Sequence, residues 1–186
     1  EGIFSPQVLN AMEALQAYAE TLPHVNGSSS VVDYLKQMNK SLNEGQGDAY
    51  RLPQDADLIA QYFLLYSASS DPADFSEEID YDYRLANIRL NLDSADFIAT
   101  KPVVEALQQY IDQHFNNAVM DEPVTASLSG RVNVNYHWIK DLGVSHFYSV
   151  VISLLCVFLV SALLFRSWAA GLLATLPVIC SILTVY

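Results

Sequence analysis

Acidic side chains that could bind a cation gather between residues 71 and 83, in the segment DPADFSEEIDYDY. Carboxylate oxygens are the ligands that Ca²⁺ prefers in proteins. An EF-hand loop, however, requires acids in a fixed order and a glycine at its turn, and this segment has neither. We therefore predict a solvated loop rather than an ion site for the acids Asp71, Asp74, Glu77, Asp80 and Asp82.

Residues that could serve as bases or nucleophiles show no catalytic spacing. The sequence contains no GxSxG, GxGxxG, P-loop or HExxH motif. The serines Ser28, Ser29 and Ser30 are expected to form a turn, with no neighbouring group that would activate a hydroxyl. We predict no catalytic, metal-binding or cofactor-binding residue, no cofactor and no enzyme activity, and the sequence assigns no substrate-binding residue. The histidines lack the spacing of metal ligands: His24, His114, His137 and His146.

Charge divides the chain into two parts. All 21 acidic residues and eight of the nine basic residues precede Phe147, which gives that part a net charge of −13. Such an acidic surface excludes nucleic acid as a partner, because phosphate neutralisation requires clustered Lys and Arg. It also argues against docking on anionic head groups. From Tyr148 to Tyr186, Arg166 is the only charged residue.

Two uncharged apolar runs flank Arg166, at residues 147–165 and 167–186. A helix of the first run would be about 28 Å long, close to the ~30 Å hydrocarbon thickness of a bilayer. A buried helical pair in a globular core is the alternative, but such a pair would need a polar face, and neither run has one. We therefore expect two transmembrane helices, with Pro177 kinking the second. Both cysteines fall in these runs and are expected to be small apolar space-fillers.

The connection between the runs is short, at residues 166–168, and it carries a cation. Arginine in so short a loop favours the cytoplasmic side, with Trp168 as an interfacial anchor. Residues 1–146 would then be extracytoplasmic. Ser167 and Gly171 lie four residues apart, as do Ala170 and Ala174, a spacing that lets another helix approach closely.

The acidic part shows helical and strand periods in turn. Helices are expected from Ser5 to Pro23, over residues 31–42 and 55–68, and after Lys101. The alternation in RLANIRLNL predicts a half-buried strand, and that in PVTASLSGRV predicts a second. Strand, helix and strand in this order predict a βαβ unit with helices on one face of a small sheet, an α+β fold.

Several segments, in order, resemble the resistance-nodulation-division (RND) superfamily, in its MMPL-type or predicted RND exporter branch. Two of them, SPQVLNAMEALQAYAETLPHV and SSVVDYLKQMN, resemble the start of the family's first extracytoplasmic loop. DYRLANIRLNLDSAD resembles its strand and turn, and ASLSGRVNV resembles the strand before the second transmembrane helix. LLFRSWAAGLLATLPV resembles the junction between the second and third helices.

The resemblance implies a ferredoxin-like, porter-type periplasmic domain at residues 1–146. Transmembrane helices at 147–165 and 169–186 and a cytoplasmic turn at 166–168 would follow. The chain would be a fragment of a proton-driven exporter in the bacterial inner membrane, crossing it more than once and moving lipid or other hydrophobic substrates. Its partners would be the lipid bilayer, the substrate and the remaining helices of the transporter. The family's proton-carrying acids lie on a later helix, so no coupling residue is assigned.

Two other classes of function remain open from the sequence. A membrane-anchored sensor or interaction ectodomain would share the same membrane segments and the same acidic domain. A membrane-tethered hydrolase would require a nucleophile that the sequence does not display. Further apolar spans with a buried acid after Tyr186 would favour transport, whereas a cytoplasmic signalling domain would favour the sensor.

Overall fold

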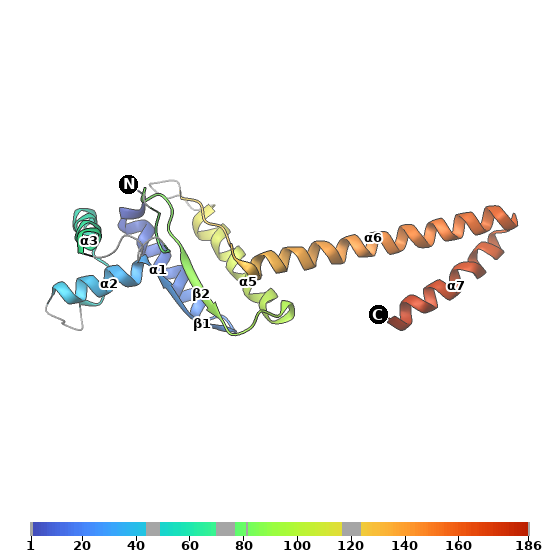
Figure 1. The fold of residues 1–186 in the computed structure, drawn as a ribbon, viewed down its shortest axis with the longest axis horizontal. Coiled ribbons are helices and arrows are strands. Elements are labelled where there is room, and N and C mark those ends of the chain that lie inside the picture. Colours follow the sequence, from blue (N-terminus) through green and yellow to red (C-terminus); the bar gives the residue numbers. More distant parts are fainter. Residues whose placement is uncertain (1, 44–48, 70–76, 81, 117–123, 186) are drawn as a thin grey trace. The chain divides into compact units, whose positions relative to one another are not determined.

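The computed structural model describes residues 2–43, 49–69, 77–80, 82–116 and 124–185. The chain divides into two compact units, Glu1–Asn133 and Val134–Tyr186. In the described part of the first unit, the α-helices are α1 (Pro6–Glu20), α2 (Val31–Leu42), α3 (Ala56–Ser69) and α5 (Phe97–Ile111), and the strands are β1 (Val25–Ser30) and β2 (Ile88–Leu92). A 3-10 helix (Gly2–Phe4) precedes α1, and a π-helix (Asp112–Asn116) follows α5. The helix α6 (Arg131–Phe165) begins at the end of this unit, and α7 (Trp168–Val185) follows it (Figure 1).

Helix α1 forms where the sequence predicted it. Ser5 adopts an extended conformation at the N-cap, and Pro6 occupies the first turn, where its missing N–H costs nothing. The apolar stripe is buried over its length, with both Leu9 and Ala19 fully inaccessible. Its first half packs with α2 and α3, and its second half packs with α5 and the sheet. Helix α1 therefore links the two apolar cores of the domain.

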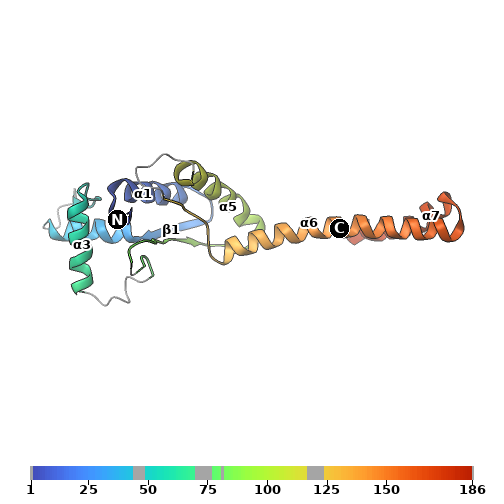
Figure 2. The ribbon, with the colours of Figure 1, turned by 90° about the horizontal axis from the view of Figure 1, so that it is seen from above.

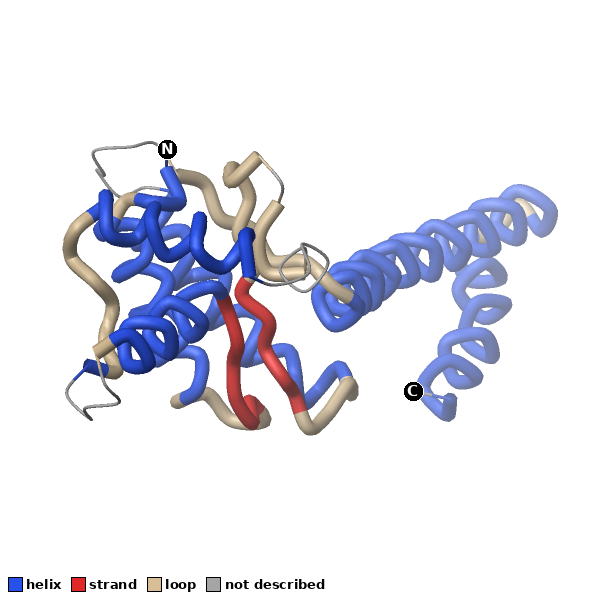
Figure 3. Tube along the Cα trace, turned by 60° about the vertical axis from the view of Figure 1, so that its left-hand side comes forward, coloured by secondary structure: helices blue, strands red, loops and turns tan. Residues whose placement is uncertain are grey.

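The sheet has two antiparallel strands, and the predicted ferredoxin-like βαβ unit is wrong. Strand β2 pairs with β1, whose three serines were expected to form a turn, in a register that sets Ser28 opposite Leu90. The register shifts between Val25 and Gly27, where Gly27 has a φ of 155°. Figures 2 and 3 show the strand pair, with α1 and α5 covering one face of it.

The second predicted strand, within residues 123–132, does not form in its described portion. Its apolar side chains still pack against the core formed by α1 and α5. The Asn116 side chain takes the place of a neighbouring strand. Its Oδ1 accepts a hydrogen bond from the Ala126 N–H at 3.0 Å, and its amide donates to the Ala126 carbonyl at 3.2 Å. These bonds satisfy the backbone of Ala126 without a ladder.

Buried polar groups hold β1 between α1 and α2. Gln16, only 6% exposed, donates to the Ser28 hydroxyl and to Asp33, and it accepts from the Ser30 hydroxyl at 2.7 Å. Ser30 also caps α2 in a reciprocal capping box with Asp33. The serines are thus partners of buried groups, which explains why a polar run forms a strand in the core.

Two helices differ in extent from the prediction. Helix α5 begins at Phe97, capped by Asp96, so Pro102 lies inside the helix rather than at its start. Helix α6 runs without a break from Arg131 to Phe165, so it begins 16 residues before the predicted transmembrane segment 147–165.

Candidate functional site

Helix α6 is the principal feature of the second unit. Its 35 residues give a length of about 52 Å, which exceeds the hydrocarbon thickness of a bilayer. Among the described residues, one helix is long and apolar enough to cross a membrane, and it is α6. None of its most apolar stretch is buried. The apolar part of α7, Trp168–Ile182, is shorter than the apolar helix α6.

No side chain in the apolar run 147–165 of α6 is buried, and most are exposed. Phe147, Leu155 and Leu163 are 68%, 55% and 77% exposed. These side chains lie on different faces of the helix, because their spacing of eight residues does not match a whole number of turns. A soluble protein rarely exposes so much contiguous apolar surface. The run is therefore suited to an apolar solvent on all sides.

The corner between α6 and α7 consists of Arg166 and Ser167. Arg166 has a φ of 48°, the left-handed conformation that ends many helices. Its N–H donates to the Leu163 carbonyl, and the Ser167 N–H donates to the Ala162 carbonyl at 3.1 Å. These two bonds form a Schellman motif, which satisfies two carbonyls at the end of α6. The Ser167 carbonyl then accepts from Gly171 at the start of α7.

Gly171 lets α7 approach α6 just beyond this corner. A Cβ at Gly171 would lie 3.0 Å from both the Ala162 Cβ and the Phe158 carbonyl oxygen. The Phe158 and Trp168 rings also meet here, with centroids 5.8 Å apart. The expected close approach at Gly171 is thus present. Away from the corner the helices are not packed side by side (Figure 1), so the expected helical hairpin is corrected to two apolar helices joined at a tight corner.

Hydroxyl groups in α7 bond within the helix. Thr175, 7% exposed, lies two residues before Pro177, and its hydroxyl donates to the Leu172 carbonyl at 2.9 Å. The Thr184 hydroxyl donates to the Ser181 carbonyl at 2.8 Å. Such back-bonding satisfies these donors without water. Both threonines are therefore compatible with a hydrocarbon environment.

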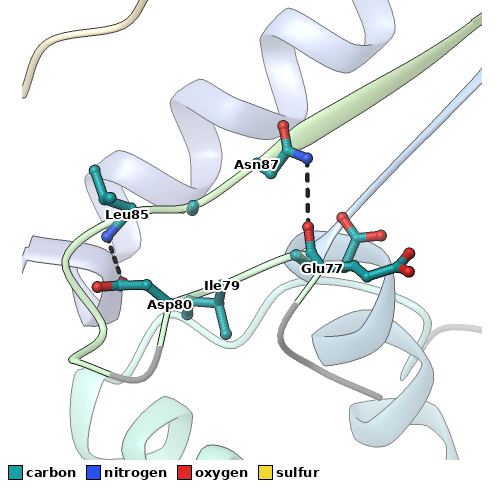
Figure 4. Close-up of a pocket in the computed structure, with 7 residues that line it drawn as sticks. Glu77, Ile79, Asp80, Leu85 and Asn87 are labelled. Carbon is teal, nitrogen blue, oxygen red and sulfur yellow. Dashed lines mark hydrogen bonds between the residues drawn. The ribbon is translucent and has the colours of Figure 1, made fainter. Parts of the chain in front are cut away.

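A hollow in the acidic domain has a volume of about 190 Å³ and lies where Ile79 pairs with Ala86 (Figure 4). Asp80 closes the turn, because one carboxylate oxygen accepts from the backbone N–H groups of Leu85 and Arg84. These bonds, that from Leu85 most, lower the pKa of Asp80. The Asn87 side chain donates to the Glu77 carbonyl at 3.3 Å (Figure 4).

Glu78 is the buried acid of this region, with 4% of its surface exposed. Arg89 donates to Glu77 at 2.6 Å and lies 3.7 Å from one oxygen of Glu78. The other oxygen, Oε2, has no hydrogen-bond partner among the described residues. Burial raises the pKa of Glu78, and the charge of Arg89 offsets only part of this rise, while Glu77 and Asp33 add to it.

This raised pKa makes stability depend on pH. Because the folded pKa lies above the unfolded one, the contribution of Glu78 is fully present below the unfolded pKa and is lost as pH rises through the folded pKa. Glu78→Gln stays neutral at every pH, so we expect it to stabilise the domain at pH 7.5 relative to wild type by about 1 kcal/mol. At pH 4 the difference should shrink. Thermal unfolding at both values measures it.

Glu77→Gln is the matched control for this prediction, because the Glu77 side chain is 68% exposed. It removes the same charge from the same turn without removing a buried carboxylate. We expect its effect on thermal unfolding to change less between pH 4 and pH 7.5 than the effect of Glu78→Gln does. Equal effects of Glu78→Gln at the two values would contradict the assignment of Glu78 as the group that responds to pH.

The residues examined for chemistry in the sequence are dispersed. His24 contacts Asp93 at 2.9 Å, and His114 stacks on Tyr110. Among the described residues, no group of three or more His, Cys, Asp or Glu side chains could hold a metal ion. Cys156 and Cys180 are free and exposed on the apolar helices. Asp71 and Asp74 lie outside the described residues.

The sequence did not single out Glu78, Gln16 or Arg89. Each is a polar residue whose role depends on a partner distant in the chain, and no local motif marks such a pairing. The FRSW corner, in contrast, was visible as the only charge in a long apolar stretch. Comparisons of the chain with protein-family models, with curated proteins and with solved structures find no match.

Proposed function

We propose that residues 147–165 of α6 cross a lipid bilayer and that α7 returns into it, which anchors the acidic domain to one side. The observation that carries this proposal is the charge-free run of α6, whose most apolar stretch has no buried residue and which ends in a corner with a single cation. At that corner the carbonyl groups of Ala162 and Leu163 both accept hydrogen bonds of the Schellman motif. Neither carbonyl would therefore face lipid without a hydrogen-bond partner.

The orientation follows from the corner. Arg166 and Trp168 are suited to the interface between hydrocarbon and water on the cytoplasmic side. The acidic domain, residues 1–146, then lies on the extracytoplasmic side of a bacterial inner membrane. The first turns of α6, which include Lys140 and Asp141, stay outside the hydrocarbon, because a charged side chain at the bilayer centre is costly.

We further propose that this membrane unit serves in an exporter of the RND type that moves lipid or other hydrophobic substrates, together with further transmembrane helices. The support is the order of the sequence segments that resemble that superfamily, above all LLFRSWAAGLLATLPV at the corner. The close contact at Gly171 adds to it, because small residues are typical of helix contacts in membrane bundles. The two-stranded sheet does not support the proposed relation to this type of exporter.

Deletion of the encoding gene tests the transport function. We expect cells without it to retain more of a hydrophobic fluorescent probe, and a protonophore to raise retention in wild-type cells to the same level. Restoring the gene should restore export, and a restored copy that carries Leu155→Arg should not. Unchanged retention, together with an altered response to an external signal, would contradict transport and favour the membrane-anchored sensor.

A further inference from the structure

A hollow of about 340 Å³ lies at the corner of the apolar helices. The last turns of α6 and the first residue of α7 form it, and the Schellman motif fixes its shape by setting the direction of the chain at Arg166. This volume is within the range of small-molecule sites. Its lining residues are Leu159, Ala162, Leu163, Arg166, Ser167 and Trp168.

The hollow combines an apolar wall with one positive charge. Leu159 and Leu163 lie one turn apart on α6, and both are exposed, at 41% and 77%. Arg166 has no ion-pair partner among the described residues and is the only charged side chain from Tyr148 onward. An unpaired guanidinium beside an apolar wall is an amphipathic site, with one part for an anion and another for hydrocarbon.

Backbone dipoles at the corner do not cancel this charge. The carboxyl end of α6 brings partial negative charge, and the amino end of α7 brings partial positive charge of similar size. The two largely offset each other because the helices meet at adjacent residues. Arg166 therefore sets the sign of the field at the hollow, and its planar fork matches the geometry of a phosphate oxygen pair.

We propose that this hollow binds an anionic phospholipid, with its phosphate on Arg166 and its acyl chain along Leu159 and Leu163. Trp168 lines the same hollow, at the level where indole rings sit between head groups and hydrocarbon. The inference rests on the proposed membrane location of α6. Basic pockets at the cytoplasmic ends of transmembrane helices favour anionic lipids over zwitterionic ones, because the latter carry a compensating cation.

Lipid retention measured on the chain in nanodiscs tests the site. The nanodiscs contain equal amounts of phosphatidylglycerol and phosphatidylcholine, and native mass spectrometry counts the lipids that stay bound after release. We expect wild type to retain phosphatidylglycerol about fivefold over phosphatidylcholine, which is the preference that one cation confers near a membrane surface. Arg166→Lys should keep most of this preference.

Arg166→Gly removes the cation and keeps the corner, because glycine favours the left-handed conformation that Arg166 adopts with a φ of 48°. We expect this variant to retain the two lipids equally. The matched control is Arg131→Gln, which removes the same charge from the opposite end of α6 and should leave the preference unchanged.

Three results would overturn the proposal. The first is equal retention of both lipids by wild type, and the second is an equal loss of preference in Arg131→Gln. The third is complete displacement of the retained lipid by millimolar inorganic phosphate, which would assign the hollow to free phosphate. Labelling of single cysteines from each side of the membrane tests the membrane location separately. If that labelling gives the proposed topology but the lipid preference is absent, only the lipid site is contradicted.

Discussion

Replacement of Leu155 by arginine is expected to remove the chain from the membrane. Leu155 lies at the middle of the run 147–165 and is 55% exposed, so the new side chain would face lipid rather than protein. A central arginine costs about 3 kcal/mol on the insertion scale, which lowers the inserted fraction on the order of a hundredfold. Alkaline extraction of membranes followed by immunoblotting measures the fraction that remains inserted.

Val144→Arg is the matched control for that experiment. Val144 lies on the same helix, three residues before the apolar run, and it is also 55% exposed. At this position the arginine lies at the interface or in water, so we expect insertion at nearly the wild-type level. Equal losses in both variants would contradict the proposed boundary at Phe147, because they would place Val144 within the hydrocarbon as well.

Gly171→Leu is expected to open the corner between α6 and α7. The first added carbon would already lie 3.0 Å from the Ala162 Cβ and from the Phe158 backbone oxygen, and a backbone atom cannot rotate away. Overpacking of this kind costs about 1–3 kcal/mol. Fluorescence of Trp168 in a Trp138→Phe background reports the opening, because the Trp168 ring contacts Phe158 only while the corner is closed.

Gly143→Leu makes the same change where there is room for it. No atom lies within 4 Å of the Cβ position at Gly143, which is also helical. We expect this control to leave the Trp168 emission unchanged and to favour the helix by up to about 1 kcal/mol, because leucine is the better helix former. If the two leucine variants behave alike, the close approach at Gly171 does not hold the corner.

The helical part of the fold was predictable because its signals are local. Helix α1 shows its apolar stripe, its N-cap and Pro6 within a single window of sequence. Strand β2 was equally visible, because alternation over RLANIRLNL requires no knowledge of its partner. In both cases the buried face follows directly from the spacing of apolar residues.

The sheet was not predictable from the same rules, because its second strand is polar. Ser28 and Ser30 lie in a run that favours turns, and they become part of a strand only because Gln16 supplies buried partners from α1. The converse holds for Ala126, which lies in an alternating segment but bonds to a side chain instead of a strand. Pairing of this kind depends on distant residues, which a local pattern does not contain.

The candidate site was predictable in its composition and not in its shape. The sequence located the two apolar runs and the cation between them, and it marked Gly171 as a residue for close contact. The left-handed backbone of Arg166 and the hollow beside it arise from the Schellman bonds. The sequence does not indicate this motif, because the left-handed residue is an arginine and not a glycine. The sequence did not indicate that Glu78 is buried, because its burial depends on the packing of the whole domain.

Labelling of single cysteines from each side of the membrane tests the central claim most directly. In a Cys156→Ser, Cys180→Ser background, Ser41→Cys places a thiol on the exposed surface of α2, and Ser167→Cys places one at the corner. A membrane-impermeant maleimide added to right-side-out vesicles should label Ser41→Cys at once and Ser167→Cys only after permeabilisation. The reverse pattern would overturn the orientation, and labelling of both positions in sealed vesicles would contradict a membrane crossing by α6.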